Sequence, residues 1–237
     1  MKIGLIGYGK MGQIIGTLAE KQNHEIVLKI NSANSNLLNH DWLKQCDVCI
    51  EFSTPQTVVK NIVACFEAHV PVVCGTTGWY ETLPELAASY KDSTLFYASN
   101  FSIGVNLMFA INKFMAGLMH TQASYKVSMQ EIHHLQKKDM PSGTAITLAQ
   151  DVLVAYKELN GFGITPDKSK LVIDCVRAEG VIGTHLVQYQ SEIDEITLSH
   201  KAFNRQGFAE GALLAANWIF GKKGFFTMQD MLHLNLR

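Results

Sequence analysis

This 237-residue sequence lacks an excess of charge of either sign: 20 lysine and arginine residues balance 21 aspartate and glutamate residues, for a net charge of -1. A chain so balanced offers no electrostatic reason to bind nucleic acid or an anionic membrane surface. Long hydrophobic runs are missing too, and Met1-Lys2-Ile3 leads directly into a predicted strand instead of a signal peptide. We therefore expect a cytoplasmic protein whose partners include neither nucleic acid nor a membrane.

Cysteine is scarce as well, and its odd count does not suit a fully paired disulfide framework in a chain too large to need one. We expect reduced, mostly buried thiols at Cys46, Cys49, Cys65, Cys74 and Cys175. Cys46 and Cys49 form a CxxC pair, but no second pair accompanies it and Cys49 lies in a predicted strand. Packing is therefore favoured over a redox or zinc role for this pair.

Apolar residues make up 47% of the chain, enough for a substantial core. In the first hundred residues, short apolar runs alternate with helical stretches, which predicts a parallel, doubly wound sheet. The predicted strands are 2–6, 25–30, 48–52, 71–74 and 95–98, and helices are predicted up to about residue 20, over 56–68 and over 83–90. Turns rich in Gly, Thr, Ser and Asn follow these strands, at the edge where such sheets bind ligands.

The pattern changes after residue 103, where apolar residues at Leu107, Ala110, Ile111 and Phe114 predict a long helix over 105–118. A helix over 145–159 and strands over 125–130, 171–177, 185–190 and 195–200 predict a second, mixed or antiparallel sheet. An alanine-rich helix over 208–220 is expected to return to the first domain. The predicted fold class is α/β, with a Rossmann-like, doubly wound parallel sheet (residues 1–103 and 213–237) and a second α+β domain (residues 104–212).

The first strand is followed by a glycine-rich turn, Gly7-x-Gly9-x-x-Gly12, and then by a helix. The first glycine permits a tight turn, the second lets a pyrophosphate approach the backbone, and the third allows the helix to pack closely on the strand. The unpaired N–H groups of the helix N-terminus then face the anion. The context on both sides predicts dinucleotide binding over a plain glycine-rich turn.

An acidic residue is missing where the second strand ends, at Lys29-Ile30-Asn31. In NAD-specific proteins a carboxylate at this place binds the ribose hydroxyls of the coenzyme. Its absence removes the repulsion that would exclude a 2′-phosphate, and Lys29 or Lys10 is placed to reach one. We therefore expect NADPH to serve at least as well as NADH.

The stretch from Glu131 to Ala145, EIHHLQKKDMPSGTA, carries the candidate chemistry. If it continues the preceding strand, His133 and His134 point to opposite sides, so one can reach the reacting atoms while the other packs or binds substrate. Histidine is the commonest general acid, and Lys137 supplies a positive charge and a second proton source. The hydroxyls and free N–H groups of Ser142-Gly143-Thr144, at a helix start, suit a carboxylate. These residues predict the reduction of a small anionic substrate.

Two other interpretations of the histidines have to be weighed. A His-His pair is often structural or surface-exposed, and His185 or His200 could join it in space to bind a metal ion. The stretch shows no ligand spacing such as HxxxH. We therefore predict no metal site.

Motifs along nearly the whole chain resemble the dihydrodipicolinate reductase family. The stretch EIHHLQKKDMPSGTA is similar to the signature of that family almost position by position. Further similar segments are IEFSTP at 50–55, VVCGTTGW at 72–79, SNFSIGVN at 99–106, ITLSHKAFNRQGFAEGAL at 196–213 and GKKGFFTMQDML at 221–232.

The resemblance implies a role for each matching residue. His133 would donate and accept the proton, Lys137 would be a second proton donor that pairs with the substrate, and His134, Ser142, Gly143 and Thr144 would bind a small dicarboxylate. NADPH or NADH would contact three segments: Gly7, Tyr8, Gly9, Lys10, Met11 and Gly12; Gly75, Thr76 and Thr77; and Ser99, Asn100, Phe101 and Ser102. The resemblance also implies a homotetramer, and a reaction that yields tetrahydrodipicolinate in lysine and diaminopimelate biosynthesis.

The sequence departs from the family pattern in its shorter glycine turn, at Asn31, at Phe203-Asn204 before Arg205, and in a shortened segment over 31–47. Two alternatives remain open at this point. One is another imine or amino-acid dehydrogenase, such as an aspartate dehydrogenase, and the other is a dinucleotide sensor without catalytic activity. If the protein were such a sensor, we would expect His133 or Lys137 to be lost, but both are present.

Overall fold

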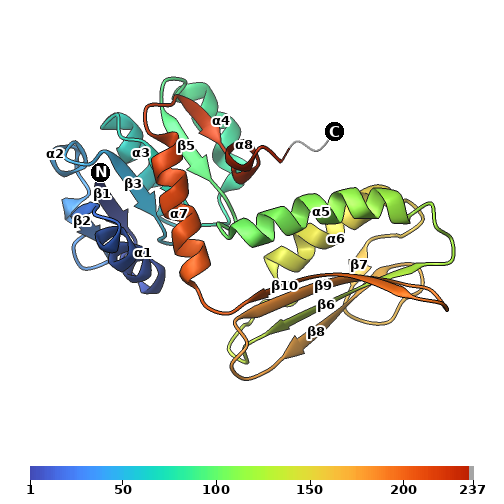
Figure 1. Cartoon of the computed structure of the whole chain (residues 1–237). Coiled ribbons are helices and arrows are strands. Elements are labelled where there is room, and N and C mark those ends of the chain that lie inside the picture. Colours follow the sequence, from blue (N-terminus) through green and yellow to red (C-terminus); the bar gives the residue numbers. More distant parts are fainter. Residues whose placement is uncertain (235–237) are drawn as a thin grey trace. The chain divides into compact units, whose positions relative to one another are not determined.

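The computed structural model describes residues 1–234, and the chain divides into two compact units (Figure 1). The first comprises Met1–Ser102 and Gln206–His233, and the second comprises Ile103–Arg205 together with Leu234. The return to the first unit falls at Gln206 rather than at residue 213, because the returning helix starts there and buries Ala209 and Ala212 in the core of the first unit. The last three residues of the expected segment 213–237 lie outside the described residues.

The first unit is built on a six-stranded parallel sheet with the order β11-β5-β4-β3-β1-β2. Its strands are β1 (Lys2–Ile6), β2 (Glu25–Ile30), β3 (Val48–Glu51), β4 (Val72–Cys74), β5 (Thr94–Tyr97) and β11 (Gly224–Phe226). Its helices are α1 (Lys10–Lys21), α2 (His40–Leu43), α3 (Val58–Glu67), α4 (Leu83–Ser89), α7 (Gln206–Ile219) and α8 (Met228–Leu232), with 3-10 turns η1 (Ser35–Leu37) and η2 (Tyr80–Thr82). The predicted doubly wound sheet is confirmed.

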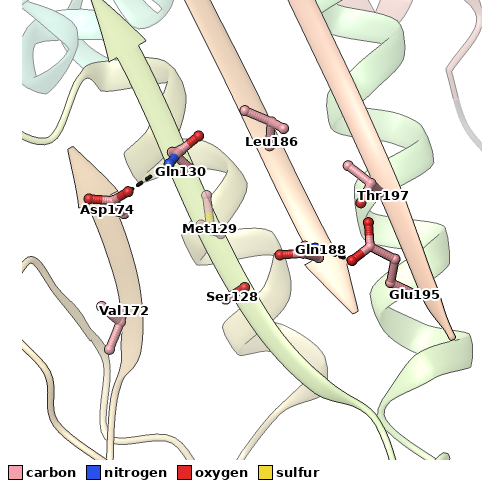
Figure 2. A pocket seen from close by; sticks show the side chains of 9 residues that line it. All are labelled: Ser128, Met129, Gln130, Val172, Asp174, Leu186, Gln188, Glu195 and Thr197. Atoms are coloured by element: carbon pink, nitrogen blue, oxygen red, sulfur yellow. Dashed lines mark hydrogen bonds between the residues drawn. The ribbon is translucent and has the colours of Figure 1, made fainter. Parts of the chain in front are cut away.

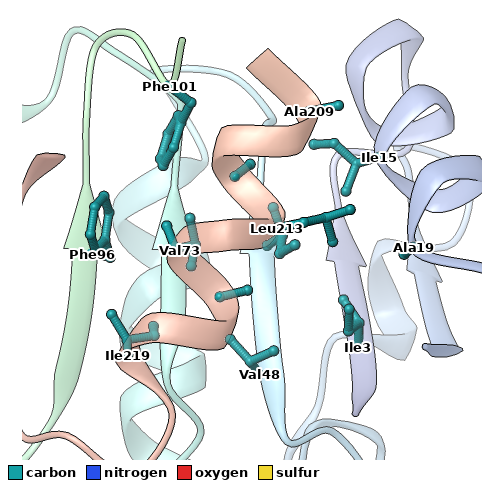
Figure 3. Close-up of a cluster of buried hydrophobic side chains, with 14 of the residues drawn as sticks. Ile3, Ile15, Ala19, Val48, Val73, Phe96, Phe101, Ala209, Leu213 and Ile219 are labelled. Carbon is teal, nitrogen blue, oxygen red and sulfur yellow. The ribbon is translucent and has the colours of Figure 1, made fainter. Parts of the chain in front are cut away.

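Strand residues of this sheet alternate between two cores, as both faces of a parallel sheet are covered by helices. Ile3, Val48 and Val73 pack against α1, α7 and α8 on one face (Figure 3). Ile6 and Cys49 contribute to the second core with residues of α2, α3 and α4. Strand β11 and helix α8, of three and five residues, were not predicted.

The second unit is built on a five-stranded mixed sheet with the order β10-β9-β6-β8-β7. Its strands are β6 (Lys126–His133), β7 (Phe162–Gly163), β8 (Leu171–Arg177), β9 (Gly183–Gln190) and β10 (Glu195–Ala202). Strand β6 pairs parallel with β8 and antiparallel with β9, which confirms the predicted mixed sheet. Helices α5 (Ile103–Met119) and α6 (Gly143–Ala155) supply the buried residues that pack on it. The two-residue strand β7 lies between α6 and β8, where no strand was predicted.

Helix α5 is present as predicted, but the residues that indicated it do not form its buried face. Leu107, Ile111 and Phe114 are 42%, 47% and 55% exposed. The helix instead buries Met108 and Ala116, with Asn112 fully buried between them. Asn112 donates a hydrogen bond to the Leu148 carbonyl of α6, at 3.0 Å, and this contact explains a polar residue at the helix–helix contact. Among residues 1–234, no helix is long and apolar enough to cross a membrane.

Candidate active site

The predicted coenzyme residues lie in three loops at one edge of the first sheet. These loops follow β1, β4 and β5, and because all strands are parallel, their carboxyl ends meet at that edge. The strand order reverses between β1 and β3, since β2 lies on one side of β1 and the later strands on the other. Such a reversal is where doubly wound sheets bind dinucleotides.

The glycine turn after β1 has the geometry that a pyrophosphate needs. Gly7 has φ +91°, and a Cβ there would lie 2.1 Å from the Phe52 carbonyl oxygen, so only glycine fits. At Gly12 a Cβ would lie 2.6 Å from the Gly7 carbonyl oxygen. A Cβ at Gly9 would meet no described atom within 4 Å. The protein itself therefore requires glycine at 7 and 12, whereas Gly9 leaves room for a ligand at the start of α1.

A buried carboxylate organises the neighbouring loops, and sequence reasoning missed it. Glu51, at the end of β3, is fully buried. Its Oε1 accepts hydrogen bonds from the Ser53 N–H at 3.2 Å, from the Ser53 hydroxyl and from the Asn61 amide at 3.1 Å. The Ser53 N–H also donates to the Thr76 hydroxyl at 2.8 Å, which ties the loop after β3 to the loop after β4. Glu51 stands at the end of a predicted strand, on the edge where such sheets bind ligands, and this position is the sequence signal that could have identified it.

The structure divides the predicted coenzyme residues by accessibility. Ser99, Thr77 and Lys10 are exposed, whereas Thr76 is almost buried. Phe101 is 2% exposed and packs in the core against Phe52 and Phe96, so its ring is not available to a ligand.

The end of β2 is closed by short polar contacts. The Asn31 amide oxygen accepts from the Ala33 N–H at 2.8 Å, and Asn34 donates to the Lys29 carbonyl at 2.9 Å. The Lys29 ammonium lies 5.2 Å from the centre of the Tyr8 ring and 3.5 Å from the Glu20 carboxylate. Lys29 therefore places a positive charge at the end of β2, beside Tyr8 of the glycine turn.

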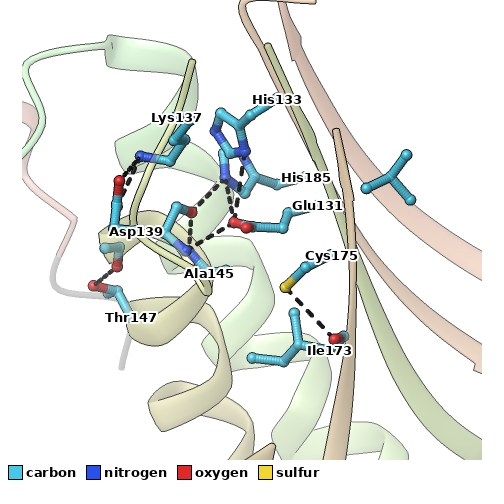
Figure 4. A network of polar contacts seen from close by, with 12 residues as sticks. Glu131, His133, Lys137, Asp139, Ala145, Thr147, Ile173, Cys175 and His185 are labelled. Carbon is cyan, nitrogen blue, oxygen red and sulfur yellow. Dashed lines mark hydrogen bonds and ion pairs between the residues drawn. The ribbon is translucent and has the colours of Figure 1, made fainter. Parts of the chain in front are cut away.

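The second candidate site follows from the alternation of β6. Residues two apart on a strand share a face, so Glu131 and His133 both point to the helix-covered side, and both are buried. The sheet register places His185 of β9 opposite Glu131, and Arg177 of β8 opposite His133. Figure 4 shows Glu131, His133 and His185 turned toward one another beside the start of α6.

Glu131 is the centre of this group. One oxygen, Oε1, lies 3.3 Å from both terminal nitrogens of Arg177. The other, Oε2, accepts the Ser142 N–H at 3.0 Å and lies 3.6 Å from Nδ1 of His133 and 3.9 Å from Nε2 of His185. Burial raises the pKa of Glu131, but its hydrogen bonds with Ser142 and the neighbouring His133 outweigh that effect, so the pKa lies below its ordinary value. The carboxylate is therefore ionised and paired.

The two histidines are held as neutral rings at the pH of the cell. Burial is the largest cause that lowers the pKa of His133, with the cations Lys137 and Arg177 adding to it and Glu131 opposing it. Burial, followed by the charge of His133, lowers the pKa of His185 to about 4. His185 Nε2 lies 3.1 Å from the Ser142 hydroxyl, which in turn accepts the Ala145 N–H and caps α6.

The loop from His134 to Ser142 carries the remaining predicted residues. Lys137 pairs with Asp139 at 2.8 Å, and Lys137 keeps 21% of its side chain exposed. His134 follows the end of β6 and is half-buried. Gly143 is the first residue of α6, and no described atom lies within 4 Å of a Cβ built on it, so its backbone is open to a ligand. Thr144 follows it in the first turn of α6.

The predicted residues of this loop therefore lie in one unit, around a buried group that the sequence did not indicate. Glu131 could have been suspected, because it stands two residues before His133 on a strand. Arg177 and His185 could not, because only the register of β8 and β9 brings them there.

Within the part of the chain that the structure describes, Glu131, His133 and His185 are the group whose ligand atoms lie close enough to hold a metal ion, within 4.8 Å of one another. The metal alternative weighed from the sequence joined His133 and His134 with His185 or His200, whereas the structure brings His133 together with His185 and Glu131. Arg177 already balances the charge of the carboxylate. A divalent cation would have to bind beside that guanidinium, which disfavours it.

The parallel sheet with its glycine-rich edge, together with a buried histidine site beside a lysine, defines an oxidoreductase that uses a nicotinamide coenzyme. Family models described as "Dihydrodipicolinate reductase, N-terminus" and "Dihydrodipicolinate reductase, C-terminus" match residues 1–101 and 104–232. The chain belongs to the dihydrodipicolinate reductase family.

Individual relatives agree with this assignment. The 4-hydroxy-tetrahydrodipicolinate reductase of Christiangramia forsetii is 46% identical over 236 residues, covering 98% of each chain. That of Rickettsia bellii is 36% identical over 97% of this chain and 94% of its own. A solved dihydrodipicolinate reductase from Paenisporosarcina sp. TG-14, bound to dipicolinate, has a TM-score of 0.77 with 26% identity and covers 98% of this chain and 99% of its own. These matches favour the reductase over the dehydrogenase and sensor alternatives.

Proposed function

We propose that His133 and Lys137 provide the protons for a reductase that acts on 4-hydroxy-tetrahydrodipicolinate. The reaction is the NAD(P)H-dependent reduction of this compound to tetrahydrodipicolinate, in lysine and diaminopimelate biosynthesis. The single observation that carries the proton role is the buried Glu131–His133 pair beside Lys137. Glu131 favours the imidazolium of His133, which is the form that donates a proton, and so opposes the burial and the cations that lower the pKa of this ring.

The two carboxylates of the substrate bind at the start of α6 and beside the loop before it. The hydroxyl of Thr144, the open backbone of Gly143 and the helix N-terminus suit one carboxylate. The Lys137 ammonium and the half-buried His134 suit the other. Ser142 is used differently from the expectation, since its hydroxyl caps α6 and contacts His185. We therefore assign Ser142 to holding the turn in place.

The coenzyme is bound by the first unit, with its pyrophosphate at Gly9 and at the start of α1. The remaining contacts come from Tyr8, Lys10, Met11 and from the loops 75–77 and 99–102. When bound, the coenzyme supplies the hydride of the reduction. Lys29, at the end of β2, and the uncharged Asn31 favour a 2′-phosphate, so NADPH serves at least as well as NADH.

The test is to follow coenzyme oxidation in an assay coupled to the synthase that makes the substrate, with NADPH and NADH in parallel. Substrate-dependent oxidation is expected for the wild type. His133→Gln is expected to lower kcat by ~10²–10⁴-fold, while NADPH still binds, because general acid catalysis contributes that much and the glycine turn is unchanged. A large preference for NADH would contradict the coenzyme proposal, and an unchanged kcat would remove His133 from its role.

The protein forms a homotetramer in this proposal, with the open face of the second sheet at subunit contacts. That face, opposite α5 and α6, has a hollow of about 550 Å³ (Figure 2). Gln130 bonds to Asp174 at 2.6 Å and Gln188 to Glu195 at 2.7 Å, while Leu186 offers apolar surface. The apolar and polar side chains on this open face offer a surface that a second subunit can cover.

The protein works in the cytoplasm in this proposal, because all five of its cysteines are free thiols. The first unit, including α7, serves as the coenzyme domain. The second unit serves as the substrate-binding and assembly domain.

A further inference from the structure

The two ring nitrogens of His133 lie in different surroundings. Nδ1 is buried and faces Glu131 Oε2 at 3.6 Å, and no described residue gives it a hydrogen bond. Nε2 lies on the other edge of the ring, beside Gly183 at the start of β9. A Cβ at position 183 would approach Nε2 to 3.1 Å, so the glycine keeps space open next to this nitrogen.

The carboxylate decides which nitrogen of the neutral ring carries the proton. A lone pair on Nδ1 would point at an anionic oxygen and be repelled, whereas an N–H there would be attracted. The ring therefore has its proton on Nδ1, and Nε2 is the atom that is free to exchange a proton with a ligand. The other charged or titratable groups near the ring are Lys137 and Asp139 of the loop, Arg177 of β8 and His185 of β9.

Arg177 holds Glu131 and also the loop that carries Lys137. Its guanidinium contacts Glu131 Oε1 at 3.3 Å, donates to the Asp139 carbonyl at 2.8 Å and lies 3.4 Å from the Lys137 carbonyl. The second oxygen of Glu131 accepts the Ser142 N–H at the end of the same loop. One buried ion pair therefore anchors the loop at three backbone positions.

We propose that Glu131, held by Arg177, is a positioning residue that fixes the proton of His133 on Nδ1 and so makes Nε2 the atom that transfers a proton. This inference rests on the proposed catalytic role of His133. A purely structural ion pair would also hold the loop, but it would have no effect that depends on the His133 ring. The two roles can therefore be separated by experiment.

The first experiment is a double-mutant cycle of Glu131→Gln and His133→Gln in the coupled assay. Glu131→Gln alone is expected to lower kcat roughly 10- to 100-fold, a part of the whole acid–base contribution, with the KM for NADPH unchanged. In the His133→Gln background the same change is expected to lower kcat by less than about threefold, because its effect passes through the missing ring. The exposed Glu158→Gln in the same unit is the matched control and is expected to leave kcat unchanged.

The outcomes distinguish the two proposals. An equal loss of kcat in both backgrounds, or no loss from Glu131→Gln alone, overturns the positioning role and leaves His133 as the proton donor. A wild-type kcat in His133→Gln contradicts the proposed function itself. Glu131→Asp, which keeps the charge but shortens the side chain, is expected to restore part of the kcat that Glu131→Gln loses.

The second experiment does not depend on activity. Nitrogen-15 NMR of the wild-type protein, with labelled histidine, distinguishes the two neutral tautomers of each ring, and the spectrum of His133→Gln assigns the signal of His133. The expected result is a proton on Nδ1. A proton on Nε2 in the wild type overturns the inference. Where Glu131→Gln folds, its His133 signal is expected to shift toward the other tautomer.

Discussion

At the scale of single residues, the site is organised by the charge of one buried side chain. Glu131 is fully buried, yet it is paired with Arg177 and accepts an N–H from Ser142, so its desolvation is offset by short charged contacts. His185 and His133 share its other oxygen as neighbours. The sequence indicated the histidine and the lysine, because their residue types are those of proton donors, but it did not indicate the carboxylate beside the histidine or the guanidinium that pairs with it.

Lys137 allows a residue-scale prediction about the substrate. We expect Lys137→Ala to raise the KM for the substrate and to lower kcat, reducing kcat/KM by roughly 10- to 100-fold, because a hydrogen bond to a charged group is worth about 1.5–3 kcal/mol. Steady-state kinetics in the coupled assay measures both constants. The adjacent, exposed Lys138→Ala is the control and should behave as wild type. A loss of kcat with a normal KM would count against a role in binding.

His185 gives a prediction about pH and stability. Its folded pKa of about 4 lies below the ordinary value of about 6.5, so the unfolded chain binds the proton more tightly. The stability it contributes is complete above pH 6.5 and is lost as the pH falls from there toward 4. By pH 5 the loss in the free energy of unfolding is about 2 kcal/mol. Burial also lowers the pKa values of His133 and His200, which act in the same direction.

The measurement for His185 is the exchange of backbone amide hydrogens in β6 and β9 at pH 7 and pH 5. His185→Gln, which cannot titrate, is expected to lose about 2 kcal/mol less than the wild type between these conditions. His40→Gln, at an exposed position of the first unit, should match the wild type. Equal losses in His185→Gln and wild type would show that His185 is not the group responsible.

At the scale of helices and strands, the coenzyme edge depends on how strand ends are tied together. Glu51 holds the loop after β3, and Ser53 links that loop to Thr76 after β4. We expect Glu51→Ala to lower the free energy of unfolding of the first unit by roughly 1–3 kcal/mol, because it removes the acceptor that the half-buried Ser53 and the buried Asn61 share. We also expect weaker binding of NADPH.

Tryptophan fluorescence follows the unfolding of this unit selectively, because Trp42, Trp79 and Trp218 all lie in it. Titration with NADPH measures the dissociation constant. The matched control is Glu67→Ala, at an exposed position of α3. An unchanged dissociation constant in Glu51→Ala would mean that the loops keep their binding geometry without this anchor.

The elements themselves differed in how well the sequence predicted them. Strands β1, β2 and β8 have the predicted bounds, because each is a short apolar run closed by a turn. Strand β11, with three residues, was not predicted. Helix α5 was predicted from Leu107, Ile111 and Phe114, whose spacing has a helical period. This spacing indicates a helix, but it does not show whether these side chains pack in the core, and they are exposed. The positions of Arg177 and His185 beside Glu131 depend on the register between strands, and the sequence of a single strand does not show its register.

At the scale of the whole molecule, the proposed tetramer gives a prediction about mass. Leu186→Lys places a charge on the open face of the second sheet, and we expect it to shift the protein from a tetramer to smaller species in light scattering. The exposed Val154→Lys, on helix α6, is the control for adding a charge to an apolar surface position elsewhere in the same unit. A wild-type particle that already has the mass of a monomer would contradict the proposal outright.

The discontinuity of the first unit has a consequence for the way the chain is made. Residues 1–102 leave the ribosome first, but their core also needs Ala209, Leu213 and Ile219 of α7, and β5 obtains its outer neighbour only with β11. The second unit, apart from Leu234, is the continuous segment Ile103–Arg205, and this segment has been synthesised before α7. We therefore expect the domain that is translated second to finish folding first. Until then the sheet face carrying Ile3, Val48 and Val73 is covered by α1 but not by α7 and α8, and the uncovered part is a binding site for a chaperone.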